Sequence, residues 1–122
     1  MMKDIFKDIL SIEGVQGVAV IDAQGGLLLS RFPDQYKQEE SSMGRADWSL
    51  LVSELVDILE AEFVFERRRL YVRKIQPGFF ITVLDDIAPM SMVRLNCEIM
   101  QSSLDRLKQG GRFGQILKKK IF

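Results

Sequence analysis

The residues in this sequence that could do chemistry are few, and none of them forms a recognisable catalytic motif. The chain contains no histidine, so the usual general base near neutral pH is missing. It also lacks the GxxxxGK[ST] phosphate loop, the HExxH zinc motif and the GxSxG nucleophile motif. A single cysteine without histidine does not make a zinc site. We therefore expect a protein that is not an enzyme and that binds no metal or cofactor.

Paired carboxylates and a lone thiol are the remaining candidates for a catalytic or metal site. Asp85 and Asp86 could hold Mg²⁺, but they lie between a predicted strand and a predicted helix, where acids commonly favour the helix dipole. Cys97 falls on the apolar stripe of that helix and has no base nearby in the sequence, which is typical of a buried core thiol. We interpret all three residues as structural.

Three further motifs have both a functional and a structural interpretation. Gly25-Gly26 could bind phosphate, but no helix N-terminus follows it to hold an anion, so we interpret it as a hairpin turn. Arg67–Arg69 could supply an arginine finger in trans, although a solvated turn explains the run more simply. Met90 and Met92 are more typical of core filling, with Met92 the candidate for an exposed contact.

The charges divide the chain into an acidic and a basic half. Residues 1–66 hold 5 basic and 13 acidic side chains, whereas residues 67–122 hold 12 and 4, so that the total is zero. Nucleic-acid binding by the basic half is the less favoured interpretation, because folding can bring these charges against acidic neighbours. Complementary protein surfaces are favoured.

Length and hydropathy indicate one domain in the cytoplasm. A chain of 122 residues suits a single hydrophobic core. No apolar run is long enough to cross a bilayer, and the first twelve residues alternate charged and apolar side chains, unlike a signal peptide. The lone cysteine also suits a reducing compartment.

Apolar spacing predicts three helices, which position everything else. The first covers Lys3–Ile12, the second begins at the capping residue Asp47 and continues to Leu59, and the third follows Pro89 to about Leu107. Pro33–Met43 has no periodicity and is predicted to be a mobile loop.

Period-two alternation and turn residues predict five strands. Val15–Asp22 and Leu27–Phe32 form a hairpin across Gly25-Gly26. A meander of three strands then covers Glu62–Glu66, Leu70–Ile75 and Phe79–Leu84. Gly110-Gly111 ends the last helix, which leaves a basic tail over residues 110–122 behind a domain over residues 1–109. We expect the tail to be dispensable for folding and to make at most weak, salt-sensitive surface contacts.

The order helix, two strands, helix, three strands, helix resembles the roadblock family, named for a dynein light chain and including bacterial regulators of Ras-like gliding-motility GTPases. The segments IEGVQGVAVIDAQGGLLLS, from Ile12, and YVRKIQPGFFITVLDDIAPMSMVRLNCEI, from Tyr71, carry the resemblance. It implies an α/β fold in which a five-stranded antiparallel sheet has one helix on one face and two on the other.

The resemblance also implies a homodimer, formed by the third strand and the second helix. An edge strand and a wide apolar helix face both need covering, which agrees with this expectation. The expected interface residues are Trp48, Leu51, Leu55, Ile58, Glu62, Phe63, Val64, Phe65 and Glu66. The acids expected near a partner are Glu54, Asp57 and Glu60.

Three functions are compatible with these expectations. The first is a homodimeric, non-catalytic regulator or adaptor that binds a small Ras-like GTPase, as the resemblance implies. The second is a scaffold subunit without a GTPase partner. The third is a small-molecule sensor, since other α/β domains enclose ligands between sheet and helix.

Overall fold

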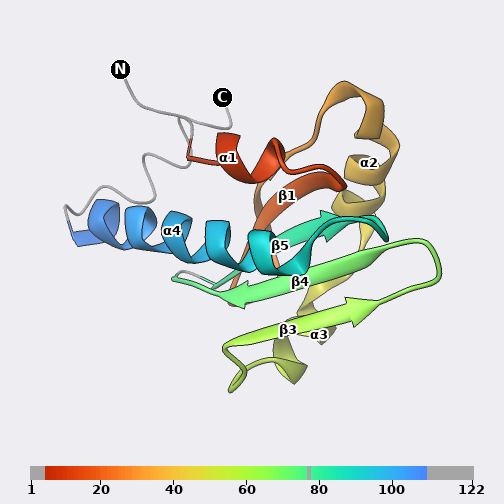
Figure 1. The fold of residues 1–122 in the computed structure, drawn as a ribbon. Coiled ribbons are helices and arrows are strands. Elements are labelled where there is room, and N and C mark those ends of the chain that lie inside the picture. Colours follow the sequence, from red (N-terminus) through yellow and green to blue (C-terminus); the bar gives the residue numbers. More distant parts are fainter. Residues whose placement is uncertain (1–4, 77, 110–122) are drawn as a thin grey trace.

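The computed structural model describes residues 5–76 and 78–109, except for the side chains of residues 104–109. One antiparallel sheet lies between two layers of short and long helices (Figure 1). The elements follow in the order α1 (Lys7–Leu10), β1 (Val15–Asp22), β2 (Leu27–Arg31), the 3₁₀ helix η1 (Asp34–Tyr36), α2 (Lys37–Arg45), α3 (Trp48–Glu54), β3 (Glu60–Val64), β4 (Arg69–Lys74), β5 (Gly78–Leu84) and α4 (Met90–Gln109).

The sheet has the strand order β2-β1-β5-β4-β3, so β2 and β3 are its edges. In the central strand β5 every residue is buried, because helices cover both of its faces. Its ladder to β1 runs from Val15 opposite Leu84 to Asp22 opposite Gly78. The ladder between β3 and β4 runs from Glu60 opposite Arg73 to Val64 opposite Arg69.

Helices α1 and α4 cover one face of the sheet. Phe6 precedes α1 and stacks on Phe80 of β5, with the ring centroids 5.7 Å apart. From α4, Val93, Cys97 and Met100 enter the same core at steps of four and three residues. Helices α2 and α3 cover the opposite face, where Met43 and Val52 pack on side chains of β1 and β5. Period-two alternation in the strands therefore divides one sheet between two apolar cores.

The α/β class and the five-stranded antiparallel sheet are confirmed, and so is the hairpin turn at Gly25-Gly26. Gly25 has φ of +88°, which favours glycine, and the Asp22 carboxylate accepts hydrogen bonds from the backbone N–H groups of Gln24 and Gly26. The first helix is shorter than predicted, since it ends at Leu10, where the Ser11 hydroxyl turns back to the Asp8 carbonyl.

The loop predicted over Pro33–Met43 is wrong, because this segment contains η1 and most of α2. The apolar periodicity of this segment is weak because only one of its side chains, Met43, is buried in the core. Polar contacts of Glu40 hold the rest of α2 in place. Glu40 accepts a hydrogen bond from Ser30 of β2 at 2.8 Å and pairs with Lys37 at 3.1 Å. The face with one expected helix therefore carries two. Tertiary contacts stabilise α2 where intrinsic propensity does not indicate it.

Candidate protein-binding interface

The outer edge of β3 is the feature around which the candidate site is built. Its inner edge pairs with β4, and no other strand in the described part of the chain pairs with its outer edge. Ala61 and Phe63 point to the α2 and α3 side and pack against that core, whereas Val64 is 71% exposed. An edge strand with exposed apolar side chains is a template for pairing with another chain.

Helix α3 lies beside this edge, and its N-terminus is capped as predicted. The Asp47 carboxylate accepts hydrogen bonds from the Ser49 backbone N–H at 3.1 Å and from the Ser49 hydroxyl. These bonds hold the pKa of Asp47 below its usual range. Val52 and Leu55 face the core, while Leu50 points outward and is 70% exposed. The helix therefore has an inner and an outer apolar face.

The predicted extension of this helix to Leu59 is wrong, because α3 ends at Glu54. The Leu59 carbonyl accepts the Lys74 N–H at 2.8 Å and thereby continues the ladder with β4. The Lys74 ammonium group donates to the Val56 carbonyl at 2.7 Å. Residues that helical spacing alone assigns to α3 therefore pair with β4 instead. Strand β3 begins at Glu60, two residues before the predicted start.

Two adjoining grooves run along this surface. The first, of about 700 Å³, lies between α3 and β3, and the second, of about 460 Å³, continues towards α2 and the turn between β3 and β4. Ala46, Trp48, Phe65 and Leu70 line both of them. Trp48 is fixed in this position because its indole N–H donates to the Met43 carbonyl at 2.8 Å. The lining is mostly apolar, which suits a protein partner.

The structure brings together six of the nine residues expected at an interface. The groove between α3 and β3 is lined by Trp48, Leu51, Leu55, Ile58, Phe63 and Phe65. Leu55 is only 4% exposed and belongs mainly to the core. Glu62 and Val64 lie on the other face of β3, and Glu66 lines the smaller groove. Strand alternation therefore splits the expected set between two faces of one edge.

Sequence reasoning missed three exposed apolar residues beside the grooves. Leu50, Val56 and Leu59 are 70%, 61% and 77% exposed. Leu50 and Val56 were missed because they do not lie on the core-facing side of the predicted helix. Leu59 was missed because helical spacing places it in that helix, whereas it lies in the segment before β3. The sequence did contain a sign of this surface, because these apolar residues lie outside the helical spacing that faces the core.

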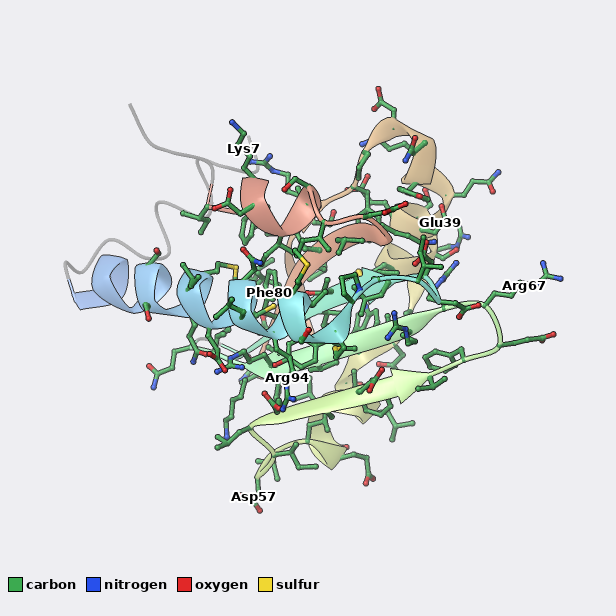
Figure 2. The ribbon with its side chains drawn as sticks, viewed as in Figure 1. Lys7, Glu39, Asp57, Arg67, Phe80 and Arg94 are labelled. Carbon is green, nitrogen blue, oxygen red and sulfur yellow. The ribbon has the colours of Figure 1, made fainter. Side chains whose placement is uncertain are left out.

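The three acids expected near a partner differ in their surroundings. Glu54 ends α3 and is exposed. Asp57 lies in the turn after it and is also exposed (Figure 2). Glu60 begins β3, where its carboxylate accepts the Tyr71 hydroxyl at 2.7 Å and the Arg73 guanidinium at 3.1 Å, and also pairs with Arg94 of α4. The hydrogen bonds from Tyr71 and then Arg94 lower the pKa of Glu60. Glu60 therefore ties the edge strand to β4 and α4.

Replacing Glu60 with glutamine is expected to destabilise the protein in a pH-dependent way. A carboxylate whose folded pKa is lowered contributes stability above its unfolded pKa, about 4, and this contribution is lost as the pH falls through the folded pKa. Urea unfolding should show a lower midpoint for E60Q than for the parent at neutral pH, with the gap closing in acid. Glu54→Gln is the exposed control. A gap that stays constant with pH would contradict this origin of the stability.

The three arginines after β3 do not form one solvated turn. Arg67 is exposed at the end of the hairpin (Figure 2). Arg68 lies 3.8 Å from Glu39 of α2. Arg69 begins β4, and its guanidinium donates to the carbonyls of Asp85, at 2.8 and 3.0 Å, and Ala88. The interpretation as a solvated turn is thus wrong for Arg69, which is a largely buried structural clamp.

The remaining chemical candidates have structural surroundings. The Asp85 carboxylate accepts the backbone N–H groups of Ile87 and Ala88 at 2.9 and 3.1 Å, just before α4. Cys97 is buried within 3.8 Å of the Thr82 hydroxyl, and burial raises the pKa of its thiol to about 11. Among the residues that the structure describes, no three acids or thiols gather as a metal site. No helix in this part of the chain has the length and apolarity to cross a membrane.

Solved structures with the same arrangement were found by comparison. Myxococcus xanthus MglB has a TM-score of 0.64 and 15% identity, covering 87% of this chain and 89% of its own. The gliding protein MglB of Thermus thermophilus has a TM-score of 0.58 and 20% identity, covering 87% of each chain. A Roadblock/LC7 domain from Streptomyces avermitilis has a TM-score of 0.64 and 10% identity, covering 84% of this chain and 92% of its own.

No protein-family model matches the sequence, and the search of curated proteins found no match to it. The structural likeness extends over most of each chain. The resemblance seen in the sequence is thereby confirmed at the level of the fold, and the chain has the roadblock fold of the MglB gliding proteins.

Proposed function

We propose that the protein is a homodimeric, non-catalytic regulator that binds a small Ras-like GTPase. The observation that carries the homodimer is the exposed apolar surface beside the outer edge of β3. Leu50, Leu59, Val64 and Phe65 are each more than half exposed there. The resemblance of the sequence to GTPase regulators of the roadblock family supports the choice of partner.

A second copy fits this surface because two identical edge strands can pair about a two-fold axis. A two-fold axis normal to the sheet places β3 antiparallel to its copy and brings the two α3 helices side by side. The outer backbone groups of β3 then gain hydrogen bonds, and the groove between α3 and β3 is covered by the same groove of the other chain. One contact thus satisfies both the edge and the apolar residues.

The GTPase is proposed to contact the acidic end of α3. Glu54 and Asp57 are exposed beside the proposed dimer surface. Glu60 stabilises the start of β3 through its hydrogen bond from the Tyr71 hydroxyl. Pairing of the α3 helices would bring two sets of these acids together, which favours a partner surface that carries basic residues. Regulation would then act through the partner's own catalytic residues, because the described residues form no catalytic arrangement around this surface.

The GTPase proposal is tested by binding to one candidate GTPase in two nucleotide states. We expect at least tenfold tighter binding to one state, which needs only about 1.4 kcal/mol of differential contact. Calorimetry with the GTPase loaded with GDP or a GTP analogue measures it. Equal affinity for both states would instead support a scaffold subunit.

Single-turnover GTP hydrolysis distinguishes regulation through the GTPase's own residues from catalysis by an arginine finger of this protein. The double variant R67A/R68A is expected to retain most of any stimulated hydrolysis, because neither arginine is expected to enter the GTPase site. Arg69 is left unchanged since it clamps the fold. Collapse of the stimulated rate with unchanged affinity would identify Arg67 or Arg68 as a finger acting in trans.

A further inference from the structure

Helix α4 carries an apolar stripe on its outer side that the fold does not use. Met92, Leu95 and Ile99 are 50%, 56% and 57% exposed, at steps of three and four residues. The core-facing side of the same helix is formed by Val93, Cys97 and Met100, which are buried. The helix is therefore apolar on two sides, and only one of them packs against the sheet.

This stripe is separate from the surface at β3 and α3. Helix α4 lies on the opposite face of the sheet from α3, together with α1 (Figure 1). Two charged residues, Arg94 and Glu98, flank the stripe one helical turn apart, and their side chains are 53% and 57% exposed. Arg94 projects from α4 towards β3, where it meets Glu60 (Figure 2).

We propose that α4 packs antiparallel against α4 of a second copy, about a two-fold axis that passes between Leu95 and Asn96. The apolar stripe supplies the contact, and the flanking charges select the orientation. With the axis at this position, Met92 of each copy lies opposite Ile99 of the other. Within one residue of the same register, Arg94 of each copy lies beside Glu98 of the other, and this happens twice by symmetry.

The charges favour the antiparallel pair and agree with the contacts already present. Arg94 and Glu98 lie on the same flank of the stripe, so a parallel pair would place them on opposite sides of the contact, where they form no ion pair. The antiparallel pair brings the two flanks together and gives two ion pairs. Arg94 can keep Glu60 while it pairs with Glu98 of the second copy, because a guanidinium has five donor hydrogens. Glu98 lies 4.0 Å from Arg73 of its own chain and has a second carboxylate oxygen for Arg94 of the other copy. The surface is thus complementary to itself, and both internal ion pairs can remain.

The contact is narrow and is expected to be weak. One helix pair covers less than the roughly 1,200 Å² that stable interfaces bury, so association should depend strongly on concentration. The β3 surface and the α4 surface have different symmetry axes. Together they would join dimers into a tetramer or into a longer chain.

Cysteine cross-linking of the full chain tests the orientation. Ser91 and Ser102 are exposed on the outer side of α4 and lie about 16 Å apart along one helix, too far for a disulfide within a chain. In the antiparallel pair, residue 91 of one copy lies close to residue 102 of the other. Oxidation should therefore link S91C/S102C into covalent dimers and leave S91C and S102C alone mainly monomeric. The native Cys97 stays in place because it is buried.

Charge exchange tests the contact itself. In sedimentation equilibrium, E98R should weaken the α4 association about tenfold, since two exposed ion pairs become repulsive. The double variant R94E/E98R should restore it, because the pairs form again with their signs exchanged. Thermal unfolding of the variants separates this effect from changes in the internal contacts of Arg94 to Glu60 and of Glu98 to Arg73. In the F65D background, where the β3 surface is disrupted, the double-cysteine cross-link should persist.

Two results would overturn the proposal. Cross-linking of the single-cysteine variants at the rate of the double variant would show a parallel or random contact. Absence of cross-linking in all three variants at high concentration would show that another segment or another protein covers the stripe. Neither result depends on whether β3 pairs or a GTPase binds.

Discussion

Phe65→Asp is expected to dissociate the homodimer while leaving the monomer folded. Phe65 directly follows β3, is 55% exposed, and lines both grooves of the proposed interface. Burying an aspartate there would desolvate a charge without a partner. Loss of an aromatic residue that carries binding energy in an interface commonly costs about 2 kcal/mol or more, so the dissociation constant should rise at least about thirtyfold.

Sedimentation velocity across a dilution series measures this change, and circular dichroism reports the fold. Leu27→Asp is the matched control, since Leu27 is a 40% exposed apolar residue on the opposite edge strand, β2. We expect it to leave the dimer intact. Leu55→Asp is unsuitable because Leu55 is buried, and its variant would unfold the core. A parent protein that stays monomeric at high concentration, or an F65D variant that stays dimeric, would remove the interface.

The fold was predictable wherever local pattern and tertiary packing agree. β5 is apolar throughout and central, and α4 repeats its inward apolar residues at helical steps, so the sequence pattern alone identifies both. The pattern misses α2 because a single buried methionine and contacts to β2 stabilise it. It also misses the end of α3, because Leu59 pairs with β4 in a contact between residues far apart in the chain.

The candidate interface was predictable in its elements but not in its details. The apolar residues predicted for α3 and β3 identified this surface as the candidate interface, and most of them line one groove. The sequence could not show that Leu50 and Leu59 point outward while Leu55 points inward, because this depends on where the helix ends. Nor could it show that Glu60 is held by Tyr71, Arg73 and Arg94, which come from two other elements.

Arg69→Met is expected to cause the largest loss of stability among the arginine variants. The Arg69 side chain is 15% exposed, and its guanidinium binds the carbonyls of Asp85 and Ala88 and lies 3.6 Å from Glu62. It thus joins β4 to the turn before α4 and to the edge strand β3. Methionine keeps the apolar stem but leaves these acceptors without their donors. Each lost partner of a buried group costs about 1–3 kcal/mol, so we expect a loss of about 2–4 kcal/mol in total.

Urea unfolding of the Arg69→Met variant measures this loss, with Arg67→Met as the control. Arg67 belongs to the same run of arginines but is exposed, so its replacement should change the free energy of unfolding by less than about 0.5 kcal/mol. Arg69→Lys should fall between them, because an ammonium group cannot reproduce the planar fork that reaches two carbonyls. Equal stability of the Arg69→Met and Arg67→Met variants would show that the guanidinium contacts add nothing to the fold. A selective loss in Arg69→Met would also explain why a functional test of the three arginines must leave this one in place.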